Sequence, residues 1–154
     1  MRRREILASL LIVPIGVLGY RVLPAVGGSS TVELTIATDG DLLAFKPTTL
    51  TCPTGAHVRL NFFHTGKNIR QEHDWVLTEP GEAARVAKAG LEAGERARYL
   101  PPGDRRVLAA TPLCGKGERV SVEFTAPAPG AYPFMCSFPG HDTFMHGVLN
   151  VTPR

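Results

Sequence analysis

The hydrophobic residues of this chain alternate with polar residues over several short stretches. Residues 31–38, TVELTIAT, alternate apolar Val32, Leu34 and Ile36 with polar neighbours, and residues 57–62, HVRLNF, follow the same pattern. A period of two places successive side chains on opposite faces of a β-strand. Each stretch therefore predicts a strand with one face turned towards a core.

Turns rich in Gly and Pro, such as APAPG at residues 126–130, separate further candidate strands. The other predicted strands are residues 42–46, 73–78, 106–111, 119–125, 132–136 and 147–151. About eight short strands predict an all-β fold, a sandwich or barrel with Greek-key connections. One stretch differs, because residues 79–94 are rich in Ala, Glu and Lys; we predict one short helix near residues 80–93, with Gly90 as a candidate end.

The charge of the chain is concentrated at its N-terminus. The sequence has 17 Lys and Arg residues against 14 Asp and Glu residues, a formal charge of +3. Residues 1–27 contain four Arg and one Glu, so they account for the whole of this charge and leave the remainder neutral. A neutral body does not support nucleic acid as a partner, since that requires a basic surface.

Residues 1–27 are typical of a bacterial export signal. A basic beginning precedes the apolar run of residues 6–20, and small residues follow near Ala25. The apolar run is shorter than the roughly 20 residues that cross a bilayer as a helix. The letters RREIL at residues 3–7 resemble a twin-arginine signal. We predict a periplasmic domain at residues 28–154, in contact with the membrane only if the N-terminal segment stays uncleaved as an anchor.

One short stretch collects residue types that bind soft metals. Residues 134–147, FMCSFPGHDTFMHG, place Cys136, His141 and Met145 at the spacing C-x4-H-x3-M, with a Pro-Gly turn between the first two. A thiolate, imidazoles and a thioether together suit copper in both of its oxidation states. This loop supplies only one imidazole, so a second must come from elsewhere in the chain. The available histidines are His57, His64, His73 and His146.

Two motifs together resemble the azurins, small blue copper proteins of the cupredoxin family. The first is HDWVLT, which begins at His73, and the second is YPFMCSFPGHDTFMHGVLNV at residues 132–151. The likeness extends over roughly residues 30–153. It implies a Greek-key sandwich of eight strands, one copper ion that alternates between Cu(I) and Cu(II), and electron transfer in the bacterial periplasm.

The resemblance also implies a ligand set when it is carried over residue by residue. His73, Cys136 and His141 become ligands in a trigonal plane, and Met145 becomes a weak axial ligand. Glu72 fills the position whose backbone carbonyl approaches copper from the opposite side in azurins.

Further residues follow from the same resemblance. The backbone N–H groups of Asp74 and Phe138 are expected to point at the Cys136 sulfur, and such contacts tune a reduction potential. The azurins have Gly-His-Asn where this chain has Glu72, His73 and Asp74. A carboxylate close to copper favours Cu(II), so we expect a lower potential than a neutral side chain would give.

Cys52, Cys114 and His64 lie outside the expected ligand set. The resemblance puts Cys52 and Cys114 at opposite ends of the domain, so we expect no disulfide between them, although an oxidising compartment invites one. His64 matches a histidine that lies near copper in azurins without binding it. A buried titrating side chain and a surface-turn histidine both fit His64.

Two functions are consistent with these observations. The first is a diffusible one-electron carrier, and the second is a copper-delivery protein without fast electron transfer. The sequence has only three methionines and no Met-rich tract for handing over copper, which favours the carrier. It also has no H-x-H pair for further copper sites, which argues against a multicopper oxidase. We therefore predict neither an enzyme nor a small-molecule substrate.

The expected surface for electron exchange surrounds His141. We predict an apolar patch built from Phe138, Gly140 and Phe144 beside this histidine, on a monomer that docks transiently with redox proteins. Basic residues near this patch give it a partly basic rim, which suits an acidic partner. These basic residues are Lys67 and Arg70.

Overall fold

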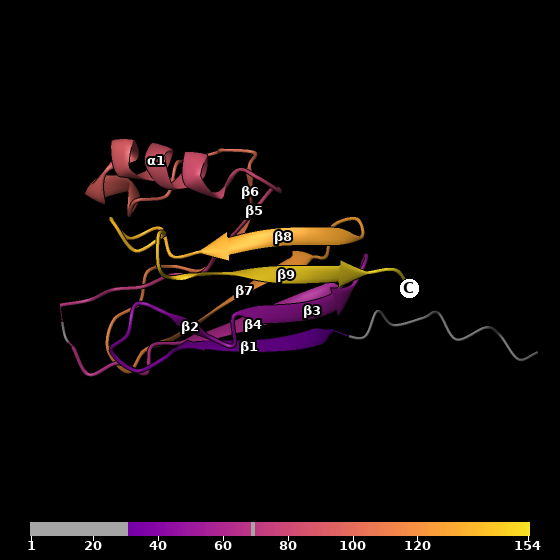
Figure 1. The fold of residues 1–154 in the computed structure, drawn as a ribbon, viewed down its shortest axis with the longest axis horizontal. Coiled ribbons are helices and arrows are strands. Elements are labelled where there is room, and N and C mark those ends of the chain that lie inside the picture. Colours follow the sequence, from indigo (N-terminus) through magenta and orange to yellow (C-terminus); the bar gives the residue numbers. More distant parts are fainter. Residues whose placement is uncertain (1–30, 69) are drawn as a thin grey trace, which may run out of the picture.

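The computed structural model describes residues 31–68 and 70–154. These residues form two β-sheets packed face to face, with one helix against the second sheet (Figure 1). The predicted export signal, residues 1–27, lies outside the described residues. Across the two described ranges, none of the helices has the length and apolar character needed to cross a bilayer.

The first sheet has four strands in the order β2, β1, β4, β7. Strands β1 and β4 are parallel, with Val32 opposite Val58, whereas β4 and β7 are antiparallel. Alternate residues of β4 are fully buried, including Leu60 and Phe62, as the period of two predicted. The bounds are β1 (Val32–Thr38), β2 (Phe45–Lys46), β4 (His57–Phe63) and β7 (Arg119–Thr125).

The second sheet has five strands in the order β3, β9, β8, β5, β6. Strands β3 and β9 are parallel although almost the whole domain separates them along the chain. Long connections of this kind are those of a Greek-key sandwich. The predicted sandwich is confirmed, with nine strands in the described residues rather than about eight. The bounds are β3 (Thr49–Pro53), β5 (Val76–Thr78), β6 (Val107–Ala110), β8 (Gly130–Met135) and β9 (His146–Thr152).

The predicted strands differ from the observed strands at three main places, and at the first of these only Phe45–Lys46 of the predicted residues 42–46 form a strand, β2. The sequence did not predict β3, a five-residue strand whose fully inward residues are only Leu50 and Cys52. The strand predicted from residue 73 begins only at Val76. The preceding N–H group, that of Trp75, donates to the hydroxyl of Thr111 at 3.0 Å rather than to a neighbouring strand.

The flap, which we define as residues 79–106, connects β5 to β6 and contains helix α1 (Ala83–Ala93) and the short 3-10 helix η1 (Glu95–Ala97). The helix was predicted, but Gly90 does not end it, because α1 continues to Ala93 and Gly94 follows at φ 74°. Gly90 serves a close approach instead. A Cβ at Gly90 would lie 2.1 Å from the carbonyl oxygen of Tyr99, so a side chain has no room there.

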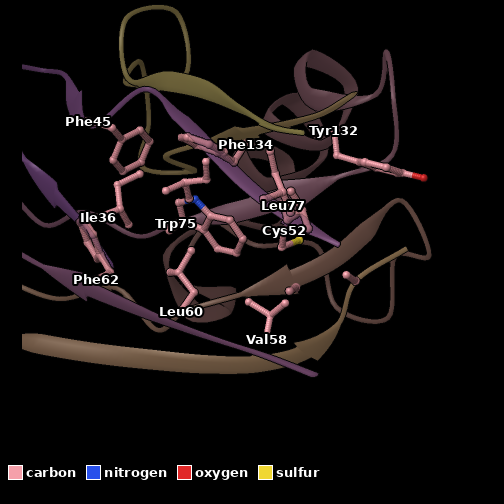
Figure 2. Packing of buried hydrophobic residues seen from close by; sticks show 14 of the residues in the cluster. Ile36, Phe45, Cys52, Val58, Leu60, Phe62, Trp75, Leu77, Tyr132 and Phe134 are labelled. Carbon is pink, nitrogen blue, oxygen red and sulfur yellow. The ribbon is translucent and has the colours of Figure 1, made fainter. Parts of the chain in front are cut away.

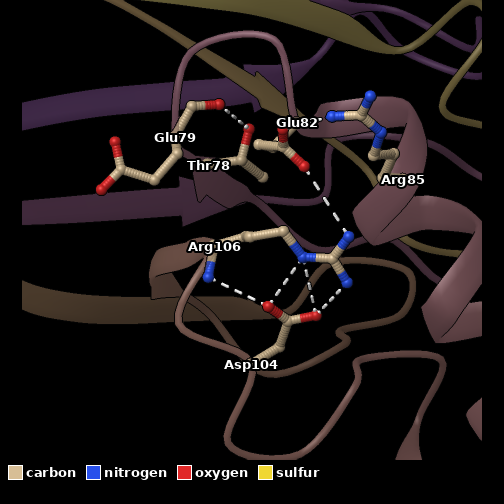
Figure 3. Close-up of polar contacts among 6 residues, drawn as sticks. All are labelled: Thr78, Glu79, Glu82, Arg85, Asp104 and Arg106. Carbon is tan, nitrogen blue, oxygen red and sulfur yellow. Dashed lines mark hydrogen bonds and ion pairs between the residues drawn. The ribbon is translucent and has the colours of Figure 1, made fainter.

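A chain of ionic contacts fixes the beginning and end of the flap (Figure 3). The Arg106 guanidinium donates from Nε to Asp104 Oδ1 at 2.9 Å, and its Nη1 lies 3.7 Å from Glu82 Oε2. These contacts with Arg106 lower the pKa of Asp104 to about 2. Glu82 precedes α1 and Arg106 precedes β6, so the ion pairs bring the two ends of the flap together.

Aromatic side chains fill the space between the two sheets (Figure 2). Trp75 is fully buried and its ring lies 5.6 Å from that of Phe134, which in turn lies 5.4 Å from Phe45 in an edge-to-face arrangement. Burying such rings is a major source of stability in a small domain. Because Trp75 also belongs to the segment that carries His73, this core gives the segment a rigid base.

Candidate metal centre

Three buried side chains converge at one end of the sandwich. The donor atoms of His73, Cys136 and His141 all lie within 4.8 Å of one another. Cys136 Sγ is 3.6 Å from His141 Nδ1 and 3.8 Å from His73 Nδ1. Among the residues that the structure describes, this is the one group of three or more His, Cys, Asp or Glu side chains arranged to hold a metal ion.

The loop of residues 136–145 presents two of these side chains by closing on itself. It joins β8 to β9 at the end of the sandwich near α1 (Figure 1). The Cys136 N–H donates to the Met145 carbonyl at 3.0 Å, and the Met145 N–H donates to the His141 carbonyl at 2.7 Å. Gly140 has φ 80°, a conformation that glycine adopts without strain, and it turns His141 back towards Cys136.

Met145 lies at the closing point of this loop. Its side chain is fully buried, and His146 beside it is exposed at the first position of β9. The two neighbours therefore point in opposite directions, as expected from the strand that begins there. The burial of Met145 and its backbone pairing with Cys136 bring a thioether to the same end of the core as the three donors.

His73 is held by residues far away in the chain. Its N–H donates to the Cys114 carbonyl at 2.9 Å, and the Cys114 N–H donates to the His73 carbonyl at 2.8 Å. Burial, and next the neighbouring His141 and His64, lower the pKa of His73 to about 4. Burial also lowers the pKa of His141. Both imidazoles are therefore neutral at neutral pH, which is the form that binds a metal.

The Cys136 thiol has the opposite tendency. Burial first, and the nearby Asp74 carboxylate second, raise its pKa well above the ordinary value. Backbone N–H groups of Asp74 and Phe138 hydrogen-bond to the sulfur and act in the other direction. A bound cation would supply the remaining stabilisation of the thiolate, because a coordinating thiol loses its proton.

Asp74 ties the two segments of the site together. The Ser137 N–H donates to Asp74 Oδ1 at 2.7 Å, and the Ser137 hydroxyl donates to Asp74 Oδ2. Burial raises the pKa of Asp74 to about 6, against the opposing effect of the bonds from Ser137. The sequence did not identify Ser137, although its position directly after Cys136 was the available signal.

Two alternatives were predicted for His64, a buried side chain and a surface-turn histidine. The structure has it buried, with only 2% of its surface exposed. Its ring centre lies 4.8 Å from that of His73. Nδ1 accepts a hydrogen bond from the Gly66 N–H at 3.1 Å, and Nε2 lies 3.1 Å from the Gln71 carbonyl, to which it donates in the tautomer that satisfies both. Both ring nitrogens of His64 are thus occupied, which leaves it no donor atom for a metal.

The remaining candidates are His57, which lies away from the centre, and the two cysteines outside the centre, Cys52 and Cys114. His57 is partly exposed and lies 3.1 Å from Glu123 on the first sheet. All three cysteines fall within the described ranges, where each is buried and free. Cys114 was expected in a loop at the copper end, and it lies there as the backbone partner of His73.

The donor set of the site indicates which metal it suits. One sulfur and two imidazole nitrogens, buried at one end of a Greek-key sandwich, fit copper that alternates between two oxidation states. This fold and this site define a blue copper protein of the cupredoxin class.

Comparison with known proteins gives the family. Residues 31–152 match the copper binding proteins of the plastocyanin/azurin family, and the chain belongs to this family. It is 42% identical over 126 residues to auracyanin-A of Chloroflexus aurantiacus, which covers 80% of this chain and 76% of that protein. It is 37% identical over 123 residues to azurin iso-2 of Methylomonas sp. strain J, and this match covers 76% of this chain and 95% of that protein.

Solved structures agree with this assignment. Auracyanin A, described as a "blue" copper protein from a green thermophilic photosynthetic bacterium, matches with a TM-score of 0.74 at 41% identity. The match covers 80% of this chain and all of that one. The protein is therefore a blue copper electron carrier, and copper is its cofactor.

Proposed function

We propose that His73 Nδ1, Cys136 Sγ and His141 Nδ1 bind one copper ion, with the Met145 thioether and the Glu72 carbonyl as weak axial ligands. The convergence of the three donors within 4.8 Å carries this proposal. The burial of Met145 at the end of the ligand loop and the position of Glu72 directly before His73 support the axial pair. Copper bound there supplies a one-electron couple.

The protein contributes a site that does not rearrange. The ligand loop is closed by its own hydrogen bonds, and His73 is held between Cys114 and the bond of Asp74 to Ser137. Donors that are fixed in advance need little movement when the charge of the metal changes. The site is also dry, because the donors are 7% exposed or less.

Electron exchange is proposed to take place at the edge of His141. Its ring is 7% exposed and lies 4.8 Å from that of Phe138, while Phe144 is 66% exposed on the same loop. We propose that these residues, together with the exposed Gly140, make up the apolar patch for docking. Such a small apolar surface suits brief docking with another redox protein, and the function needs no small-molecule substrate or catalysed reaction.

The charged rim of this patch is mixed. Lys67 and Arg70, which are exposed and shortly precede His73 in the chain, supply its basic part. The carboxylate of Glu72 is partly balanced by Arg98 at 3.3 Å. We propose that the protein works in the periplasm as a monomer, either diffusing freely or held by residues 1–27; this part rests on the sequence of the N-terminal segment alone.

The absorption spectrum of the copper-loaded protein tests the ligand set. A Cu(II)–thiolate bond gives intense charge-transfer absorption, so the wild type should be blue and Cys136→Ser should be nearly colourless. Cys52→Ser is the matched control, because Cys52 lies in β3 away from the site, and it should remain blue. An ordinary square-planar Cu(II) spectrum in the wild type would contradict the proposal.

A further inference from the structure

Two consecutive residues of the flap have an unusual backbone conformation. Arg98 and Tyr99 have φ values of 52° and 56°, in the left-handed region that residues with a Cβ seldom occupy. Hydrogen bonds impose this conformation, because the Arg98 N–H donates to Glu95 at 2.8 Å and the Tyr99 N–H donates to Gly94 at 3.1 Å. Strain of this kind is kept where the surrounding structure fixes a residue for a purpose.

The side chain of Tyr99 points from the flap towards the metal end. Its ring meets the ring of Phe138 edge to face, with centres 5.5 Å apart and planes at 72°. The Phe138 ring in turn lies 4.8 Å from the imidazole of His141. Three rings in contact therefore lead from the partly exposed Tyr99 to a proposed copper ligand.

The rings of Tyr99 and Phe138, but not that of His141, line a groove on the flap side of the metal end. The groove has a volume of about 380 Å³ and is mainly polar, unlike the apolar patch of Phe144 and Gly140. Arg98 spans it by donating to Glu72 Oε1 and to the Leu113 carbonyl, both at 3.3 Å. The other charged residues that line it are Arg70, Glu95 and Glu118.

We propose that Tyr99 is a second point of electron exchange, which connects this groove to His141 through Phe138. The inference rests on the proposed copper ligands and adds an exchange point beside the apolar patch. One electron passes from a reduced redox protein docked at the groove, which is oxidised by one electron, to the Cu(II) centre, which is reduced to Cu(I). The rings of Tyr99 and Phe138 only bridge the gap, so they are neither oxidised nor reduced and no bond or proton changes place.

A photoactive ruthenium polypyridyl label provides a reductant at a known position. Attached at Glu95→Cys it sits on the groove, and attached at Leu42→Cys it sits in the turn before β2 on the other sheet. Leu42 is 63% exposed and Glu95 is also exposed, whereas the native cysteines are buried, so labelling is selective. The measured quantity is the rate of electron transfer from each label to copper after a light pulse.

Removal of the ring should affect only one of these labels. Tyr99→Leu should slow transfer from the Glu95 position at least several-fold and leave the Leu42 position unchanged, while Tyr99→Phe, which keeps the ring, should restore the rate. An equal loss of rate from both labels would mean that the variant distorts the copper site. An unchanged rate from both labels would mean that the electron does not pass through the ring of Tyr99. Either result overturns the proposal.

The copper-free protein gives a second readout. If Tyr99 contacts Phe138 as described, Tyr99→Leu should shift the ring proton resonances of Phe138 and leave those of the buried Trp75 in place. Unmoved Phe138 resonances would also overturn the proposal. A parent protein without blue absorption would instead contradict the copper ligand set, so the two failures are distinguishable.

Discussion

The two segments that build the metal centre are held in different ways. The loop of residues 136–145 closes through hydrogen bonds between its own residues, and three of the five proposed ligands belong to it. The segment that carries Glu72 and His73 is held from a distance. In the part of the chain that the structure describes, residues 73–75 hydrogen-bond to Cys114, Thr111 and Ser137, which follow them by 36 or more positions. The Glu72 carboxylate pairs with Arg98, 26 positions further on.

This difference separates local from tertiary preorganisation. The ligand loop lies between the paired strands β8 and β9, whereas the segment of His73 is held by residues of the segments that follow β6 and β8. The two bonds from Ser137 to the Asp74 carboxylate connect the two segments directly, beside the contact of the Asp74 N–H with the Cys136 sulfur. Changes at His73 and Asp74 should therefore test the tertiary half of the site, and changes at Cys136 the local half.

The largest effect is expected from removal of the tertiary ligand. His73→Ala should weaken copper binding by more than the about 10–100-fold that loss of a supporting residue produces. His146→Ala is the matched control, because His146 is exposed beside the site and should leave the affinity unchanged. Competition with a copper chelator measures both. Equal affinities of the two variants would exclude His73 as a ligand.

Breaking the connection between the segments should reduce stability. Asp74→Ala leaves the buried Ser137 N–H without its acceptor, so we expect the free energy of unfolding of the copper-free protein to fall by about 1–3 kcal/mol. The measurement belongs near pH 4, because the raised pKa of Asp74 makes its ionisation oppose folding increasingly as the pH rises from about 4 to about 6. Asp74→Asn retains an acceptor for the Ser137 N–H, so its free energy of unfolding should fall less. Equal stability of Asp74→Ala and the wild type would show that the connection is not structural.

Proton release distinguishes the contributions of the two segments to copper binding. At pH 7.5 Cys136 is protonated, because its pKa is raised well above the ordinary value, and His73 is neutral, because its pKa is about 4. Copper binding should therefore release about one proton, from Cys136. The affinity for copper should then rise about tenfold for each unit of increase in pH, or about 1.4 kcal/mol. Calorimetry in buffers of different ionisation enthalpy measures this number. Release of two protons would mean that a histidine is charged in the free site.

The smallest expected effect concerns the reduction potential. Above its pKa of about 6, Asp74 is negatively charged and favours Cu(II), so Asp74→Asn should raise the potential. An interaction of about 1–2 kcal/mol at an effective dielectric constant near 20 corresponds to about 40–90 mV for one electron. The wild-type potential should rise as the pH falls through this pKa, and that of the variant should stay level. Identical potentials at every pH would remove the electrostatic role of Asp74 and leave its bond to Ser137.

The same local and tertiary distinction decides what could be predicted from the sequence. The spacing of Cys136, His141 and Met145 identified the local loop without any knowledge of the fold. Spacing did not select His73 from the other histidines, and only the resemblance to azurins did so. The pairing of His73 with Cys114 depends on chain segments that no local pattern relates.

The fold shows the same limits. Strands β1 and β4 follow from alternation, because every second residue packs in the core. Strand β3 has too few inward residues to stand out, and its pairing with β9 is what makes it a strand. Gly90 looked like a helix end, because the sequence does not reveal that the backbone of Tyr99 lies against it.

The central claim is that the site holds copper unchanged in both oxidation states. The most direct test reduces the copper-loaded protein in the presence of a Cu(I) chelator, removes the reductant and reoxidises the sample, with metal content and blue absorption recorded at each stage. We predict that copper stays on the protein and that the full absorption returns over repeated cycles. Transfer of copper to the chelator on reduction would contradict the account and indicate copper delivery instead.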